Sequence, residues 1–143
     1  MRKNLVQIAL VGCFVILFCG AATAAGMNAM RIEVPFVFIA GEYVFPAGEY
    51  FVEMDRCLSN GNALGSSLVF TKTSEKARYI VTAFPTSTLS QPQARMTFHR
   101  YGNRYFLTNV ESSGLKSRLL PTRAEKELAA KTSPAETVSV ATD

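Results

Sequence analysis

The sequence predicts an all-β, mainly antiparallel domain, either a small β-sandwich or an open barrel of about six strands, with one short C-terminal helix. Three observations predict it. Apolar and polar residues alternate with a period of two in short runs, turn residues separate these runs, and a helix-capping signal precedes a last helical stretch. Such alternation is typical of strands with one buried face, so the strands should enclose a single core.

The N-terminal residues 1–24 have the order of a secretory signal peptide. Arg2 and Lys3 precede an apolar run from Leu5 to Cys19, and small residues follow it. We expect cleavage after Ala24, with cleavage after Ala25 as the close alternative. The mature protein is therefore expected in the periplasm or outside the cell.

Two other fates of this segment stay open. An uncleaved run of about 20 apolar residues would be long enough to cross a bilayer. Alternatively, Leu10-Val11-Gly12-Cys13 has the residue types of a lipoprotein signal, which would anchor the protein through Cys13. However, Cys13 lies in the middle of the apolar run, whereas a lipidated cysteine is expected at its end. Because cleavage after Ala24 would remove the apolar run, we expect a mature form that does not span the membrane.

Cleavage after Ala24 leaves 119 of the 143 residues, enough for one domain over 25–131. The polar stretch 132–143 is expected to be a disordered tail. The mature chain carries 13 basic and 11 acidic residues. This excess is too small to predict a nucleic-acid partner.

Cys57 is the only cysteine left after cleavage, so the mature chain cannot form an internal disulfide. A single thiol in an oxidising compartment is most often buried and inert. Pairing of Cys57 with a second protein molecule is the less favoured alternative.

The first predicted strand spans residues 31–39, where Ile32, Val34, Phe36 and Phe38 share one face. Pro35 cannot donate a hydrogen bond to a neighbouring strand, so the strand lies at an edge or has a bulge at Pro35, and we expect an edge. Residues 45–48 predict a turn. A second strand over residues 49–56 then buries its own alternating face, made of Tyr50, Val52 and Met54.

A hairpin is predicted from residues 67–72 and 78–84, joined by the polar stretch 73–77. The sequences at 59–62 and 65–66 are typical of loops, and residues 85–93 predict an exposed connection.

A second hairpin, over residues 95–112, has the clearest signal. Gly102-Asn103 suits a two-residue turn of type II′ or I′ and sets the pairing of the strands. The expected opposite pairs are Arg100 with Tyr105, His99 with Phe106, Phe98 with Leu107, Thr97 with Thr108, and Met96 with Asn109.

A helix is predicted over residues 123–131. Thr122 and Glu125 have the capping-box spacing, in which each side chain bonds to the other residue's backbone amide. Leu128 is the only large apolar residue, so the helix should pack weakly.

Several short motifs stand out along the chain. They are Val34-Pro35-Phe36 with Phe38, Phe45-Pro46-Ala47-Gly48-Glu49-Tyr50, His99-Arg100-Tyr101-Gly102, and Leu120-Pro121 with Arg123-Ala124-Glu125. Together they resemble the motifs of a family of small, uncharacterised exported proteins of acidobacterial type. The resemblance covers residues 32 to 129 and implies no activity. The family pattern often has an acid where Val37 stands and leucine where Phe45 stands, so a site that uses that acid is not expected here.

His99 is the only histidine. A zinc site would need Cys57 and carboxylates from distant loops, without a ligand spacing that predicts it. A hydrolase triad is poorly supported, because His99 has no evident acidic partner and no Gly-x-Ser-x-Gly motif is present. No glycine-rich phosphate loop predicts a nucleotide. We expect no metal and no cofactor.

The best candidate surface is a polar and aromatic rim around the hairpin turn, formed by Arg100, Tyr101, Arg104 and Tyr105. Such surfaces bind partners and anions. The favoured alternative is that each arginine covers a tyrosine, Arg100 on Tyr105 and Arg104 on Tyr101. Farther along, Arg118 and Arg123 are candidates to bind a carboxylate, from a ligand or from Glu111.

The sequence thus predicts an exported, non-enzymatic β-domain that serves as a binding or structural module of the cell envelope. Its partner is an envelope protein or polymer of unknown identity. The alternatives are a hydrolase-like enzyme that uses His99 and a lipid-anchored protein modified at Cys13.

Overall fold

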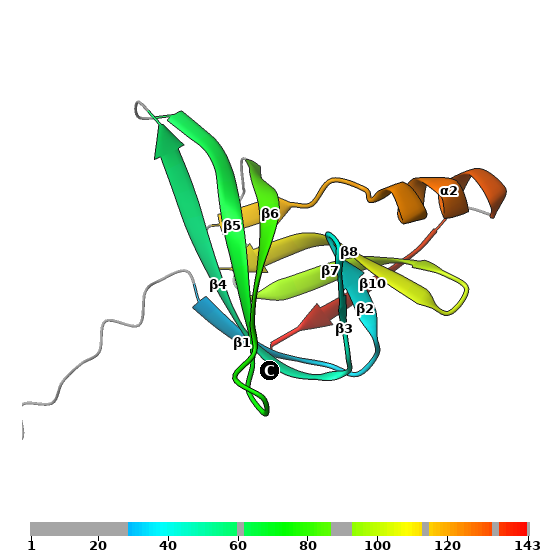
Figure 1. The fold of residues 1–143 in the computed structure, drawn as a ribbon, viewed down its shortest axis with the longest axis horizontal. Helices are drawn as coiled ribbons and strands as arrows, with labels where there is room; N and C mark the ends of the chain where they lie inside the picture. Colours follow the sequence, from blue (N-terminus) through cyan, green and yellow to red (C-terminus); the bar gives the residue numbers. More distant parts are fainter. Residues whose placement is uncertain (1–28, 60–61, 87–92, 113–114, 133–134, 143) are drawn as a thin grey trace, which may run out of the picture.

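The computed structural model describes residues 29–59, 62–86, 93–112, 115–132 and 135–142. The expected signal segment, with Cys13, Ala24 and Ala25, lies outside these residues. The strands are β1 (Ala29–Val34), β2 (Phe38–Ala40), β3 (Tyr43–Phe45), β4 (Gly48–Ser59), β5 (Asn62–Lys72), β6 (Arg78–Thr86), β7 (Arg95–Tyr101), β8 (Arg104–Ser112), β9 (Leu115–Arg118) and β10 (Glu136–Ala141), and the helix is α2 (Arg123–Lys131) (Figure 1).

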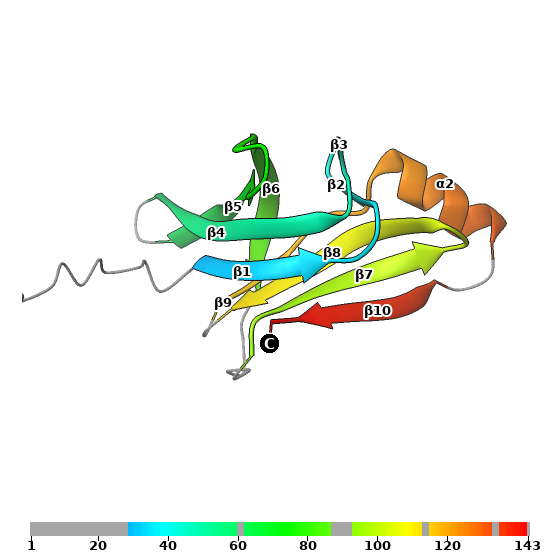
Figure 2. The same cartoon turned by 90° about the horizontal axis from the view of Figure 1, so that it is seen from below.

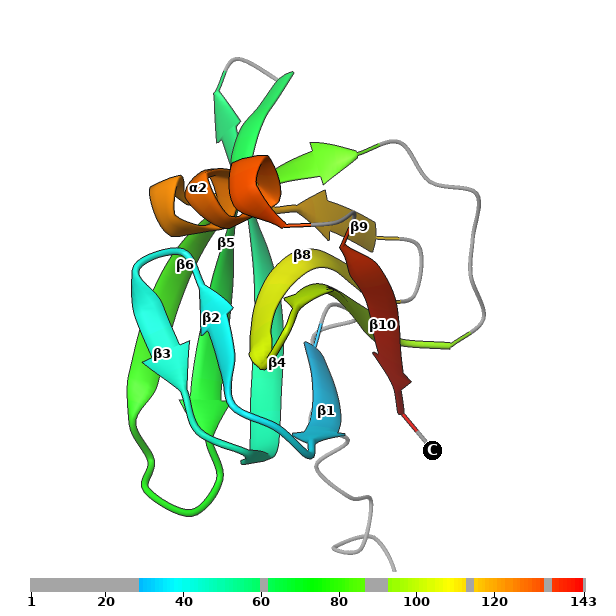
Figure 3. The ribbon, with the colours of Figure 1, turned by 90° about the vertical axis from the view of Figure 1, so that its right-hand side faces the viewer.

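These strands form one mixed sheet of ten strands. Its main path runs β1-β4-β5-β6-β9-β8-β7-β10 with antiparallel neighbours, and the β2–β3 hairpin joins β8 through the parallel β2–β8 pair. The sheet curls until β1 and β10 come near each other (Figures 2 and 3). No strand pairing joins the described residues of β1 and β10, so the sheet stays open there. The all-β prediction with one short helix is confirmed, although the sheet has more strands than the six expected.

Aromatic side chains fill the inside of the curl. The Phe38 ring stacks on Phe45 with 4.9 Å between centroids and meets Phe98 edge-on at 5.4 Å. Tyr50, Val52 and Met54 of β4 all point inward and are buried, as the alternation predicted. Because β1, β2, β4 and β7 each contribute to this cluster, the core ties together parts of the chain that are distant in sequence.

Pro35 divides the predicted strand 31–39 into two elements. β1 ends at Val34 and pairs only with β4, whereas β2 begins at Phe38 and pairs with β3 and β8. The edge position of β1 is confirmed, but the single strand is wrong. Between the two strands, the Phe36 ring stacks on Tyr105 with 3.9 Å between centroids. The chain therefore changes neighbours at the residue that cannot donate a ladder hydrogen bond.

The hairpin of β7 and β8 confirms the predicted register next to the turn. Tyr101 to Phe98 face Arg104 to Leu107, and Gly102 has a φ of 59°. Among the described residues, only Lys76 and three glycines have a positive φ, so the φ of Asn103 is negative. A positive φ at the first turn residue and a negative φ at the second are typical of a type II′ turn.

Farther from the turn the predicted pairs are wrong, because a β-bulge at Thr108 shifts the register by one residue. Thr97 faces Asn109, and Met96 faces Val110. The Thr108 hydroxyl donates to the Thr97 carbonyl oxygen at 2.9 Å. The shift brings Val110, which is fully buried, into the core.

Several strands extend beyond their predicted limits. β5 starts at Asn62 and passes through Gly65 and Ser66, which the sequence assigned to loops. β6 continues through Pro85 to Thr86, and the unpredicted strand β9 pairs with its end. These departures have a common cause: the neighbouring strand continues the pairing. The buried hydroxyls of Ser66 and Ser117, 2.9 Å apart, satisfy each other inside the sheet.

The expectation of a disordered tail over 132–143 is wrong for residues 136–141. They form β10, which pairs with β7 along its whole length. Val138 and Val140 are half-buried while Thr137, Ser139 and Ala141 are exposed. This is a strand alternation in a polar composition, and it becomes ordered because β7 offers a free edge.

Tyr50 gives a pH-dependent prediction. Its buried hydroxyl donates to the Pro46 carbonyl oxygen. Burial, with smaller contributions from Glu75 and Tyr79, raises the pKa of Tyr50 from 10.0 to about 12. The folded state therefore holds this proton more tightly than the unfolded state does. Its contribution to stability is present in full below pH 10 and is lost as the pH rises through 12.

We expect the free energy of unfolding, measured with urea, to fall more steeply over this alkaline range in the native chain than in a Tyr50→Phe variant. The phenylalanine has no proton to lose. Tyr43→Phe, at a half-exposed tyrosine, is the matched control and should keep the native slope. Equal slopes for the native chain and Tyr50→Phe would contradict the prediction.

Candidate functional site

A pocket lies beside β9, where β6, β7 and β8 also contribute lining residues. Its volume is about 310 Å³. We call it the His99 pocket. Six of its lining side chains are polar and two are apolar: Thr86, His99, Thr108, Asn109, Lys116 and Arg118, with Leu119 and Pro121.

β9 brings most of this pocket together, because it pairs with β6 on one side and β8 on the other. Lys116 lies opposite Thr86, and Arg118 lies opposite Asn109. His99 follows the buried Phe98 on β7 and so points to the opposite face. The sequence did not predict this pocket, since β9 itself was not expected.

His99 has an acidic partner, contrary to the sequence expectation. Its Nδ1 lies 3.0 Å from Glu125 Oε1. Glu125 is 4% exposed and is the buried residue of α2. The carboxylate accepts the Nδ1 hydrogen, which leaves Nε2 as the ring's second polar atom. The contact joins residues that are 26 positions apart in the sequence, so no local motif could predict it.

The helix α2 has its predicted bounds, and Thr122 is its N-cap. The Thr122 hydroxyl accepts a hydrogen bond from the Glu125 backbone amide at 3.1 Å. The reciprocal half of the capping box is wrong, because the Glu125 side chain turns to His99 instead of the cap. The helix therefore docks on the sheet through a buried carboxylate, with Leu128 only half-buried.

The predicted rim around the hairpin turn is not one surface. Residues directly opposite in a hairpin share a face, so Arg100 and Tyr105 lie on one face while Tyr101 and Arg104 lie on the other. Arg100 lies over the Tyr105 ring at 5.6 Å and bonds to Glu136 at 3.2 Å. The prediction that Arg100 covers Tyr105 is confirmed; cover of Tyr101 by Arg104 stays a prediction.

Tyr101 belongs to the surroundings of His99. The two rings meet edge-on with 6.4 Å between centroids. Burial raises the pKa of Tyr101, and the nearby Glu125 carboxylate adds to the rise. The residue thus stays a neutral phenol beside the His99–Glu125 pair.

The carboxylate partners proposed for two arginines are different in the structure. Glu111 pairs with Lys116, with 2.7 Å between Oε1 and Nζ, and not with an arginine. Arg123 pairs with Glu127 of its own helix at 2.9 Å. Arg118 is exposed, and within the described part of the chain it has no ion pair.

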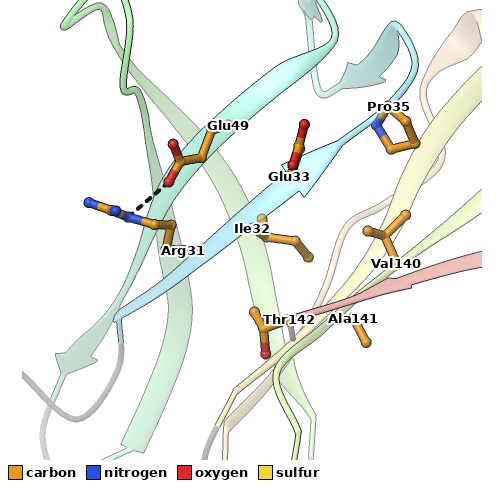
Figure 4. Close-up of a pocket in the computed structure, with 8 residues that line it drawn as sticks. All are labelled: Arg31, Ile32, Glu33, Pro35, Glu49, Val140, Ala141 and Thr142. Carbon is orange, nitrogen blue, oxygen red and sulfur yellow. Dashed lines mark ion pairs between the residues drawn. The ribbon is translucent and has the colours of Figure 1, made fainter.

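A second pocket, of about 560 Å³, lies between β1 and β10 (Figure 4). It contains the Arg31–Glu49 ion pair, with 3.0 Å between Nε and Oε1. Its other lining residues are Ile32, Glu33, Pro35, Val140, Ala141 and Thr142. Arg31 is the one basic residue that lines this pocket, and Glu49 already neutralises its charge. This pocket therefore has fewer free basic side chains to bind a ligand than the His99 pocket has.

Cys57 lies in β4 opposite Gly65, beside a register shift. Its pairing with another molecule stays a prediction.

Across the described ranges, no group of three or more His, Cys, Asp or Glu side chains is arranged to hold a metal ion. The helix in those ranges is too short and too polar to cross a membrane.

Removal of the Glu125 carboxylate should loosen the helix. We expect Glu125→Ala to lower the free energy of unfolding by about 1–3 kcal/mol, because it leaves a partly buried imidazole without its partner. Urea unfolding measures the loss, and hydrogen exchange of residues 123–131 should rise more than that of β4. Glu127→Ala, which removes an exposed acid from the same helix, is the control and should cost less than about 1 kcal/mol. Equal costs would contradict docking through Glu125.

Comparisons with protein-family models, curated proteins and solved structures find no match for this chain.

Proposed function

We propose that this chain is an exported, non-enzymatic binding module of the cell envelope and that its ligand binds in the His99 pocket. One observation carries the proposal: hydrogen-bonding side chains from β6, β7, β8 and β9 converge on one concave site. In many proteins, ligand binding depends on a few polar side chains that rigid strands or helices hold in place.

The surroundings support a preorganised site. Thr108 receives a hydrogen bond from the Asn109 side-chain amide at 3.3 Å, and its carbonyl oxygen accepts from the Leu119 amide at 2.8 Å. Glu125 holds the ring of His99. A ligand would therefore meet side chains that are already oriented, which lowers the entropic cost of binding.

Export is supported by the charged, apolar and small segments that precede residue 25. Intact mass of the protein from periplasm, medium and membrane fractions tests it. A soluble species that begins at Ala25 or Gly26 is expected. A lipidated Cys13 or an uncut N-terminus would instead make it a membrane-tethered protein, and a doubled mass without reductant would implicate Cys57.

The binding role can be tested by titrating the isotope-labelled protein with an envelope extract and following its amide NMR signals. We expect the shifts to concentrate at residues that line the His99 pocket. The pocket around Arg31 and Val140 serves as an internal control. Shifts confined to that second pocket, or no shifts at all, would count against the proposal.

A hydrolase-like enzyme is the second candidate, and the His99–Glu125 pair favours it. An imidazole oriented by a carboxylate at Nδ1 can act as a general base through Nε2. Within the described residues, however, no serine, threonine or cysteine side chain is hydrogen-bonded to His99. On any substrate found, His99→Ala should abolish turnover if this candidate is right, and unchanged turnover would eliminate it.

A further inference from the structure

We propose that the His99 pocket binds a carboxylate group, with the Arg118 guanidinium as its anchor and the Asn109 amide as a second donor. The inference rests on the proposed binding function and adds the chemical class of the ligand.

The charges around the pocket favour an anion. None of its lining side chains is acidic, and two, Lys116 and Arg118, are basic. Lys116 is neutralised by Glu111 at 2.7 Å. Arg118 has no such partner within the described residues, so its positive charge is available to a ligand. The Glu125 carboxylate does not line the pocket; it is buried and is hydrogen-bonded to His99.

The number of free donors favours a carboxylate. A guanidinium presents parallel N–H groups that match two oxygens of a carboxylate or of a phosphate. With Lys116 paired to Glu111, however, Arg118 and Asn109 offer too few donors for the further oxygens of a phosphate. Asn109 lies directly opposite Arg118 in the β8–β9 pair, so the two side chains share a face of the sheet. One hydrogen of the Asn109 amide bonds to Thr108, and the other remains for the ligand.

The size of the pocket limits what enters it. About 310 Å³ is at the small end of ligand sites. It accommodates a small organic acid or a single unit of an acidic polymer. Leu119 and Pro121 provide an apolar wall for the carbon atoms next to the carboxylate.

The test is an NMR titration of the isotope-labelled protein with sodium succinate and with poly-glutamate, followed at the Arg118 Nε–H and at the amides of Asn109 and Leu119. We expect saturable shifts. Arg118→Gln should weaken binding about tenfold or more, since a hydrogen bond to a charged group is lost. Arg78→Gln, at an exposed arginine at the start of β6, should leave it unchanged.

Inorganic phosphate at equal ionic strength distinguishes a carboxylate site from general attraction of anions. The proposal requires that phosphate bind clearly more weakly than succinate. Tighter binding of poly-glutamate per carboxylate would identify a polymer as the source, and the reverse would identify a free acid. The proposal is overturned if neither probe gives saturable shifts, if phosphate binds as tightly, or if Arg118→Gln binds like the native chain. Arg118→Lys keeps the positive charge but loses the parallel N–H groups, so it should bind succinate with intermediate affinity. It also provides a test if the Arg118→Gln variant does not fold.

An envelope extract separated by anion exchange distinguishes failure of this inference from failure of the proposed function. If only the neutral fraction shifts the pocket signals, the binding function stands and the carboxylate inference falls. If neither fraction shifts them, both fall.

Discussion

Phe38→Ala is expected to lower the free energy of unfolding by about 3–5 kcal/mol, the usual cost of removing a fully buried ring. Phe38 is 0% exposed, and its ring lies within 6.4 Å, centroid to centroid, of each of four others: Phe45, Tyr50, Phe70 and Phe98. These rings come from β3, β4, β5 and β7. The cavity left by alanine would therefore weaken contacts across the whole curl of the sheet.

Urea unfolding, followed by circular dichroism, measures this loss. Phe51→Ala is the matched control, because Phe51 lies on the outer face of β4 and is 38% exposed. It should cost less than half as much as Phe38→Ala. Similar costs for the two variants would contradict the packing described for the core.

A chain that ends at Lys131 is expected to lose roughly 2–4 kcal/mol of stability, because it lacks β10 and the two half-buried valines that β10 places on the sheet. The truncation also exposes the outer edge of β7 and removes the Arg100–Glu136 ion pair. Unpaired strand edges promote association, so this chain should also form more dimers and aggregates.

Unfolding experiments and light scattering check the two effects. A chain that ends at Ala141 keeps β10 and is the control. It loses the hydrogen bonds that the Thr142 amide and hydroxyl donate to the Ala94 carbonyl oxygen. Its free energy of unfolding should therefore fall by less than about 1 kcal/mol. If truncation at Lys131 had no effect, residues 136–141 would not be part of the folded sheet in solution.

The candidate site was predictable only in part. The sequence marked out His99 and Arg118, because one is the only histidine and the other flanks an apolar pair. It did not associate them, since their proximity depends on β9, a four-residue strand that has almost no signal of its own. Glu125 was assigned to a helix cap on good local grounds. The cap spacing and the contact with His99 compete for one carboxylate, and the tertiary contact prevails.

The fold was predictable where local chemistry decides it. Gly102 and the aromatic alternation beside it predicted the β7–β8 turn and its first pairs, and Thr122 predicted the start of α2. Prediction failed where a neighbouring strand decides the outcome. The bulge at Thr108, the continuation of β5 through Gly65, and the pairing of residues 136–141 all depend on a partner that the local sequence does not specify.

By itself, then, the sequence determined the all-β class, the inward faces of β1 and β4, the hairpin turn and the helix limits. These properties follow from side-chain periodicity and from backbone preferences over a few residues. Only the tertiary structure decided the order of strands in the sheet, the split of the first strand at Pro35, and the meeting of His99, Glu125 and Arg118. The physical reason is that strand pairing satisfies backbone hydrogen bonds across long sequence separations, and many pairings are compatible with the same local alternation.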